Sequence, residues 1–327
     1  MTPLQFERLY HEGWAELELG LRDILDPKHA TAAGRTPPSG DRVGALYRRA
    51  CDHLSLARAR SYPAYMIDRL ERMTSQAHQV IYYRREFGPS YLREFAARQF
   101  PSAVRNHAAY VAVAAAAFLL PTLVLGFVVY WRPELILSVV SSETASSFEQ
   151  MYSTSAESIG RARTASTDWV MFGYYIRNNI SVSFQCFAGG LFAGLGSLFF
   201  LAYNGAFAGA LAGYLTARGL SSTFFPFVST HSAFELTAIV LSGAAGLRIG
   251  HALLAPRRLK RIDALVGAAR EAVVLLYGVT AMLLVAAAVE AFWSSARWLP
   301  PAVKYTSAMI CWTAVLGYFL FQGRRAG

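Results

Sequence analysis

The sequence predicts an all-α, polytopic membrane protein with about six transmembrane helices and an N-terminal cytoplasmic helical region. Of its 327 residues, 54% are hydrophobic and only 16% are charged. The apolar residues gather in blocks of about 20 residues, which is the length that crosses a bilayer. One of these blocks, residues 178–213, also repeats glycine in a way that water-soluble cores do not. A soluble enzyme is therefore not expected.

Residues 1–106 are predicted to form a cytoplasmic helical domain of mixed charge. A helix-like segment covers residues 6–25, and residues 30–40 form a linker rich in glycine and proline. Further on, apolar residues recur at the three- and four-residue steps of packed helices. These residues are Leu46, Ala50, Leu54, Ile67, Leu70, Thr74, Ala77 and Ile81. The first hundred residues lack the apolar core of a secretion signal, so we expect the N-terminus to stay in the cytoplasm.

Residues 107–327 are predicted to form the transmembrane helical domain. Its expected spans are residues 107–130, 178–202, 204–220, 231–254, 271–293 and 301–322. A polar loop rich in serine and threonine, at about residues 132–170, separates the first two spans and is expected outside the cell. The third span is short, so a re-entrant segment is the alternative for it.

Basic residues set the expected orientation, because loops that face the cytoplasm carry an excess of lysine and arginine. The N-terminal region, the loop at residues 255–261 and the C-terminal tail are the basic parts of the chain. All three lie on one side only if residues 204–220 cross fully, which favours six crossings with both termini in the cytoplasm. The net charge of +10 suits anionic lipid headgroups, and nucleic acid is not an expected partner.

Glycines four residues apart predict close helix packing in the central spans. They are Gly190 and Gly194, then Gly205, Gly209 and Gly213, then Gly246 and Gly250. This spacing puts small residues on one helix face, where two backbones can approach closely. Packing within the chain is favoured over packing between subunits, and we also expect self-association into a homo-oligomer.

A few polar side chains fall within or at the edges of the spans: Asn178, Asn179, Asn204, His231 and Glu235. Such groups cost several kcal/mol in lipid unless they find partners. His231 and Glu235 are four residues apart, so they share a helix face. The set is either a proton-linked or substrate-contacting site, or a structural clamp between helices, and the clamp is favoured.

Sequence signatures of enzymes are lacking. The spacing His-x-x-x-Glu is not that of zinc proteases, and no third ligand for a metal is evident in the sequence. Ser229 and Ser232 flank His231 without a G-x-S-x-G motif, and no glycine-rich loop joins a strand to a helix. Three cysteines stand far apart and are expected to be reduced. We therefore expect no enzymatic activity, no metal and no cofactor, and an intramembrane hydrolase is only a remote alternative.

Arg248 and Glu290 are two more charged residues within the predicted spans. Arg248, in the fourth, either extends its side chain to the interface or pairs with a carboxylate. Glu290, near the outer end of the fifth, is expected at the interface, as Trp293 and Trp298 indicate.

The central sequence resembles the stage II sporulation protein M family, also called DUF95. The residues that carry the resemblance are Asn178-Asn179-Ile180 with Phe184, Asn204-Gly205 with Gly209, His231-Ser232-Ala233-Phe234-Glu235-Leu236, and Ser242 through Leu247. In the N-terminal region, Leu46-Tyr47-Arg48-Arg49 through Asp52 to Ala57-Arg58 is similar to a second pattern of that family, with His53 inserted. The resemblance covers roughly residues 1–255. Ser232 stands where the family usually has glycine, a replacement of one small residue by another.

The resemblance implies a membrane protein of the bacterial cytoplasmic (inner) membrane without a defined activity of its own. In spore formers, the namesake acts with peptidoglycan-degrading partners; elsewhere, members are often encoded beside MoxR-type AAA+ ATPases and von Willebrand A-domain proteins. We therefore expect a non-enzymatic scaffold of a cell-envelope complex, whose partners are membrane lipids and envelope or cytoplasmic proteins. The alternative is a proton-linked transporter or channel that uses Asn204, His231 and Glu235.

Overall fold

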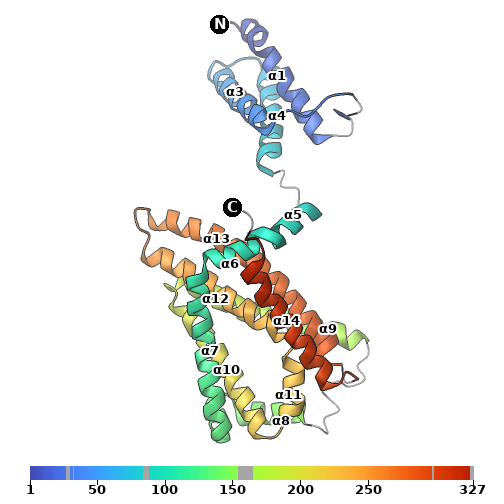
Figure 1. Cartoon of the computed structure of the whole chain (residues 1–327). Helices are drawn as coiled ribbons and strands as arrows, with labels where there is room; N and C mark the ends of the chain where they lie inside the picture. The colour runs from blue at the N-terminus through green and yellow to red at the C-terminus, as the bar shows by residue number, and fades with distance from the viewer. Residues whose placement is uncertain (27–29, 32, 84–87, 154–164, 297, 325–327) are drawn as a thin grey trace. The chain divides into compact units, whose positions relative to one another are not determined.

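A computed structural model of the chain describes residues 1–26, 30–31, 33–83, 88–153, 165–296 and 298–324. These residues form helices and connecting segments, with no strand among them. The chain divides into two compact units, residues 1–91 and residues 92–327. Both are drawn in Figure 1, and each is described by itself below.

The N-terminal unit is built on three helices, α1 (Pro3–Leu25), α3 (Gly40–Ala59) and α4 (Ala64–His78), and α4 continues as the π-helical η1 (Gln79–Tyr83). Helix α1 begins with a capping box, in which the Thr2 side chain accepts from the Gln5 backbone and the Gln5 side chain accepts from the Thr2 backbone. The predicted segment at residues 6–25 thus lies within α1. Residues 35–39, part of the predicted linker, lie in no helix and lead into α3.

A hydrophobic core fills the space between these helices. Leu46, Ala50, Leu70 and Ala77 are buried as the spacing predicts. Ile81, also predicted inside, is 37% exposed; it lies in the π-helical η1, whose wider turn departs from the three- and four-residue steps on which the prediction rests. In the same core, the Trp14 indole N–H donates to His53 Nδ1 over 3.0 Å. Burial lowers the pKa of the His53 imidazole, which favours the neutral acceptor form that this bond needs.

The second unit follows a short helical lead-in. In chain order its elements are α5 (Pro89–Glu94), the π-helical η2 (Phe95–Gln99), α6 (Phe100–Asn106), α7 (Ala108–Trp131), the 3₁₀-helical η3 (Pro133–Ser138), α8 (Ser142–Tyr152), α9 (Ala165–Ala188), the 3₁₀-helical η4 (Gly189–Leu191), α10 (Leu195–Ala217), α11 (Ser221–Val228), α12 (Ser232–Leu254), α13 (Arg261–Ala288), the π-helical η5 (Val289–Ser294) and α14 (Pro301–Phe321).

This unit begins before the boundary predicted at residue 106. Phe100 and Val104 of α6 are buried in one hydrophobic cluster with residues of α12 and α13. The segment before the first span therefore packs with the membrane helices rather than with the N-terminal core.

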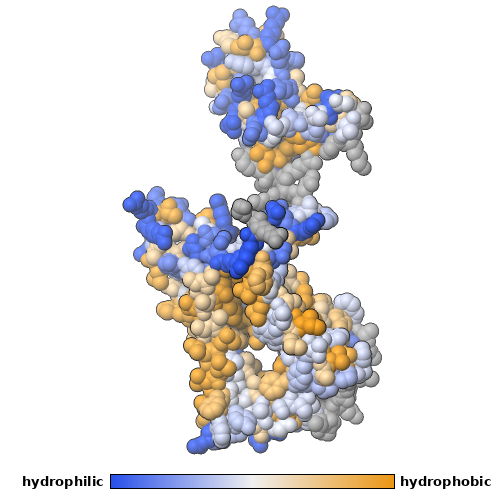
Figure 2. Space-filling view, viewed as in Figure 1, coloured by the Kyte–Doolittle hydropathy of each residue, from blue (hydrophilic) through white to orange (hydrophobic). Residues whose placement is uncertain are grey.

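Four helices of the described chain are long and apolar enough to cross a membrane: α7, α10, α12 and the continuous helix Arg261–Ser294. The centre of the unit is α12, which packs against α7, α9, α10 and α13. On α7, by contrast, large side chains such as Leu123 and Phe127 are more than 60% exposed. Figure 2 shows this apolar surface along α7, with hydrophilic residues gathered where α6 and the α12–α13 connection lie. The apolar surface is suited to lipid.

The predicted boundary between the second and third spans is wrong. Residues 178–202 do not form one helix, because α9 ends at Ala188 and the chain turns before α10 begins at Leu195. Ala193 and Gly194 have φ angles of 53° and 84° in this turn, a left-handed conformation that glycine adopts without strain. Helix α10 then continues through Asn204, whose side-chain amide donates to the Phe200 carbonyl over 2.7 Å. Asn204 therefore extends the helix rather than breaking it, and no short third span exists.

The predicted polar loop at residues 132–170 contains helical structure. It includes η3, α8 and the first residues of α9. Ser141 caps α8, since its hydroxyl accepts from the Thr144 backbone N–H over 3.2 Å. The charged residues Glu157, Arg161 and Arg163 of this loop lie outside the described residues.

We predict that α8 and the α12–α13 connection lie on opposite sides of the membrane, because α8 follows the first span and the connection carries Arg257, Arg258 and Lys260. Cysteines introduced at the exposed positions Gln150 and Lys260 test this in a chain whose three native cysteines are replaced. A membrane-impermeant maleimide should label position 150 in intact cells and position 260 only after the membrane is opened. Labelling in the reverse order would reject the predicted orientation, and labelling of both positions from the same side would reject the six-crossing topology.

Candidate functional site

The three side chains His231, Glu235 and Glu290 meet inside the second unit. His231 immediately precedes α12, Glu235 lies in its first turn, and Glu290 lies in η5. One potential ligand atom from each lies within 4.8 Å of the other two. His231 is only 5% exposed, and both carboxylates are partly buried. The predicted His–Glu pair is therefore joined by a second carboxylate from a distant segment.

A serine and a carboxylate hold the imidazole of His231 from two sides. Its Nδ1 is hydrogen-bonded to Ser294 Oγ at 3.0 Å, and its Nε2 lies 3.8 Å from Glu235 Oε2. Ser294 is fully buried. The ring is therefore fixed with one nitrogen on the hydroxyl and the other facing the carboxylates.

The π-helical turn η5 brings Glu290 and Ser294 to this place. The two residues are four apart, so they lie on the same side of the widened helix and both reach the start of α12. Single π-helical turns within α-helices are frequent at functional sites. Here the turn ends the longest apolar helix of the unit.

Lys304 of the neighbouring α14 is hydrogen-bonded to the segments that carry this cluster. Its ammonium nitrogen donates to the Ser294 carbonyl over 2.7 Å, and its own carbonyl accepts from Thr230 Oγ1 at 3.2 Å. The side chain is 8% exposed, which is rare for a lysine. Within the described chain, this ammonium makes no ion pair with Glu235 or Glu290. It therefore acts as a donor to the last turn of η5 rather than as their direct counterion.

The predicted asparagines are distributed differently. Asn179 of α9 is 2% exposed and lies beside Glu290. Its Nδ2 approaches that carboxylate without completing a hydrogen bond of regular geometry. Asn178 is exposed, and its amide donates to Asn179 Oδ1 over 3.0 Å. Asn204 is bonded within its own helix, so it is not part of this cluster in the described structure.

Three members of the cluster were not predicted to belong to it: Glu290, Ser294 and Lys304. Glu290, expected at the interface, supplies the third side chain that the local spacing around His231 lacks. The only sequence signal was a second carboxylate in an apolar span, four residues before a serine.

The seven glycines of the predicted packing set lie against other segments of this same chain. A Cβ atom on Gly205, Gly209 or Gly213 would come within 2.2 Å of a backbone carbonyl oxygen of α7. One on Gly190 would come within 2.1 Å of the Gly246 carbonyl. Gly250 meets the backbone of Gly194 in the same way. The glycine contacts join α10 to α7, and α12 to the turn after α9.

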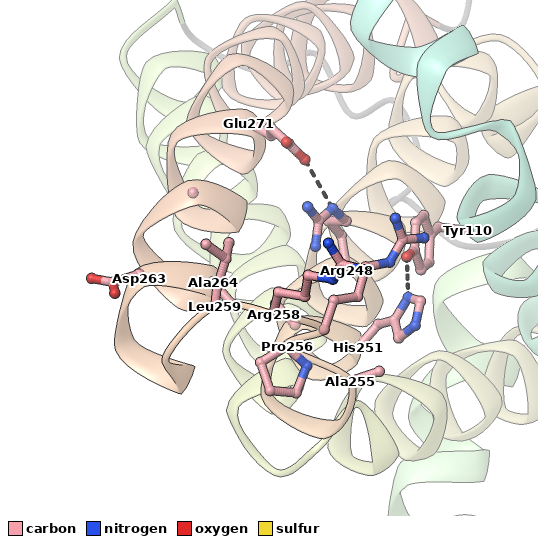
Figure 3. A pocket seen from close by; sticks show the side chains of 13 residues that line it. Tyr110, Arg248, His251, Ala255, Pro256, Arg258, Leu259, Asp263, Ala264 and Glu271 are labelled. Carbon is pink, nitrogen blue, oxygen red and sulfur yellow. Dashed lines mark hydrogen bonds and ion pairs between the residues drawn. The ribbon is translucent and has the colours of Figure 1, made fainter.

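A basic pocket of about 740 Å³ opens at the opposite end of α12, among α7, α12 and α13. Figure 3 shows Arg248 reaching Glu271, and Tyr110 reaching His251. The Arg248 Nε lies 2.8 Å from Glu271 Oε2. Arg248 therefore pairs with a carboxylate, which was one of its two predicted states. Arg257 and Arg258 also line the pocket, and the excess of cationic groups suits an anionic headgroup.

Comparison with known protein families gives two matches. The family described as "Stage II sporulation protein M" matches residues 115–295. This range covers more than half of the chain and contains His231, Glu235, Glu290 and the seven packing glycines, and it confirms the family resemblance of the central sequence. A family described as a domain of unknown function (DUF8413) matches residues 4–83, within the N-terminal unit. No curated protein and no solved structure matches the chain significantly.

Proposed function

The chain belongs to the stage II sporulation protein M family, and we propose that it is a non-enzymatic scaffold of a cell-envelope complex in the bacterial inner membrane. In this proposal, helices within residues 108–321 cross the membrane six times and anchor the chain, and the N-terminal unit binds partner proteins in the cytoplasm. Family analogy suggests MoxR-type ATPases and von Willebrand A-domain proteins as these partners. A homo-oligomer would multiply the binding sites.

One observation carries the proposal, namely the division of the chain into two units with separate cores. The N-terminal unit has its own hydrophobic cluster, and its outer surface is rich in charged residues. A separately folded domain of this kind is suited to bind a partner protein. A notch between α1 and α3, lined by Leu9, Tyr10, Arg49 and His53 among others, offers both apolar and cationic contacts to a partner.

The basic pocket supports the placement of this anchor. Cationic side chains from α12 and the α12–α13 connection gather at one end of the apolar surface, where they would meet headgroups of the cytoplasmic leaflet. Lipid contact there requires no catalytic group, which agrees with a structural role.

Affinity purification from native membranes tests the scaffold. The tagged full chain should retain a stable set of partner proteins in mild detergent, and a chain lacking residues 1–91 should insert in the membrane but lose them. A sharper variant is Arg49→Glu in the notch, with Arg8→Glu on the exposed surface of α1 as its matched control. Only the notch variant should lose partners. Recovery of no partner above an unrelated membrane bait would contradict the proposal.

The buried polar cluster favours a second candidate, a proton-linked transporter. Two carboxylates and a histidine within one membrane unit are the groups that proton pathways use. This candidate now rests on His231, Glu235 and Glu290, since Asn204 bonds within α10. It requires proton-dependent flux in liposomes that Glu235→Gln abolishes while the protein stays folded and bound to its partners. Under the scaffold proposal, Glu235→Gln leaves both partner binding and liposome permeability unchanged.

A further inference from the structure

We propose that His231, Glu235 and Glu290 bind a divalent transition-metal cation, for which Zn²⁺ is the test ion. The three residues offer one imidazole nitrogen and two carboxylate oxygens, a ligand set that such ions accept. Nothing in this proposal depends on the scaffold function, because a bound ion can stabilise the membrane unit whatever its partners are.

The three ligand atoms lie up to about an ångström farther apart than the ligand atoms around a bound metal ion. The ligand atoms lie within 4.8 Å of one another, and His231 Nε2 lies 3.8 Å from Glu235 Oε2. Around a tetrahedral zinc ion with bonds of about 2.0–2.2 Å, neighbouring ligand atoms lie roughly 3.3–3.5 Å apart. We expect rotation of the two glutamate side chains to close this difference.

The charges of the cluster require a positive partner. Two carboxylates this close together repel each other strongly away from water. Lys304 has its ammonium on the Ser294 carbonyl and makes no described ion pair with them. The pair therefore needs either a shared proton or a cation between its oxygens.

The orientation of His231 suits the cation. In the tautomer that donates its Nδ1 hydrogen to Ser294 Oγ, the lone pair of Nε2 faces Glu235 Oε2, so that two hydrogen-bond acceptors face each other. A metal ion between them satisfies all three groups at once. Metal-bound histidines characteristically donate their other ring N–H to a neighbouring oxygen, which is the role that Ser294 has here.

A buried amide beside the cluster, with no hydrogen bond of regular geometry, is placed to contact a ligand of the metal. Asn179 is 2% exposed, its Oδ1 already accepts from Asn178, and its Nδ2 has no hydrogen-bond partner. A water molecule or hydroxide on the metal would accept from this amide. Three protein ligands and one water complete a four-coordinate site.

Metal binding by the purified full chain in detergent tests the proposal. The protein is stripped with a chelator, loaded with Zn²⁺, desalted and measured for bound metal per chain. We expect the wild type to retain about one Zn²⁺, with a higher melting temperature than the stripped protein. Cobalt loading should give the intense visible absorption of a tetrahedral site.

Two isosteric variants and one control locate the site. Glu290→Gln and Glu235→Gln should each weaken Zn²⁺ affinity by at least tenfold, because each removes a ligand charge. Glu271→Gln is the matched control, since it removes the carboxylate beside His107, the other described His–Glu pair, and should leave this affinity unchanged. Circular dichroism and gel filtration establish that each variant is folded.

Two outcomes overturn the proposal. Equal zinc retention by the wild type and both glutamine variants would mean that zinc binds elsewhere. No retention by the wild type, with no tetrahedral cobalt spectrum, would mean that the carboxylate pair holds a proton instead. The wild-type measurements decide the question even if a variant fails to fold.

Discussion

Replacement of Gly209 by leucine is expected to prevent the stable assembly of the membrane unit. Helices α7 and α10 run side by side (Figure 1), and Gly209 lies where their backbones come closest. A Cβ atom at this position would lie 2.0 Å from the carbonyl oxygen of Thr122. The obstructing atoms belong to the backbone, so no rotation of a side chain relieves the clash.

The same face of α10 repeats this contact along its length. Gly205 lies against the Phe118 carbonyl, Gly209 against that of Thr122, and Gly213 against that of Gly126. A residue larger than glycine at the middle position must therefore push the whole helix away. This displacement would also separate the contacts at Gly205 and Gly213, and lipid tails do not restore the dispersion contacts that are lost.

A graded series separates this clash from the intrinsic effect of glycine on a helix. Alanine normally stabilises a helix interior by about 1 kcal/mol relative to glycine. At Gly209 we expect Gly209→Ala to destabilise instead, by about 1–3 kcal/mol or more from overpacking. Gly317 of α14 is the matched control, because a Cβ there would meet no atom within 4 Å.

Thermal unfolding and gel filtration in detergent measure the series. Gly209→Leu should elute as aggregated or unfolded protein, Gly209→Ala should melt below the wild type, and Gly317→Ala should melt at or above it. Equal melting temperatures for Gly209→Ala and Gly317→Ala would show that α7 and α10 do not pack in this register.

Local spacing predicted one side of each contact but not its partner. The four-residue glycine repeat marked the packing face of α10, because residues four apart in the sequence lie on the same face of a helix. The opposing face of α7 contains Phe118 and Thr122, which no spacing rule selects. The turn at residues 189–194 was missed for a related reason: an apolar, glycine-rich run is read as a continuous span when no polar residue marks the reversal.

The polar cluster shows the same limit. His231 and Glu235 were found because they are four residues apart and both are polar within apolar sequence. Glu290 and Ser294 come more than fifty residues later, and they reach His231 only because α13 folds back along α12 and ends in a π-helical turn. A contact between segments so far apart in the chain produces no periodic pattern in the sequence, so the third side chain of the site is identified only in the structure.

A second large effect is expected at Phe100, which fastens α6 to the membrane helices. Its side chain is 4% exposed, and its ring occupies the space left by Gly278 of α13, where a Cβ would lie 2.1 Å from Phe100 Cε2. The ring also makes an edge-to-face contact with Phe319 of α14 at 5.4 Å between centroids. Truncation of a buried phenylalanine to alanine typically costs about 3–5 kcal/mol.

We therefore expect Phe100→Ala to free α6 while the spans stay inserted, so that hydrogen exchange rises in residues 95–106 and the melting temperature falls. Phe184→Ala is the matched control, because that ring is 64% exposed on α9.

The combination of Phe100→Ala with Gly278→Leu should recover part of the lost stability, since the leucine side chain refills the space of the removed ring. A double variant more stable than the two single losses predict would assign the effect to the Phe100–Gly278 contact. Strictly additive losses of stability would instead mean that the two residues are not in contact. Because α6 lies between the N-terminal unit and the first span in the sequence, its release would also loosen the attachment that a scaffold needs to hold its partners at the membrane.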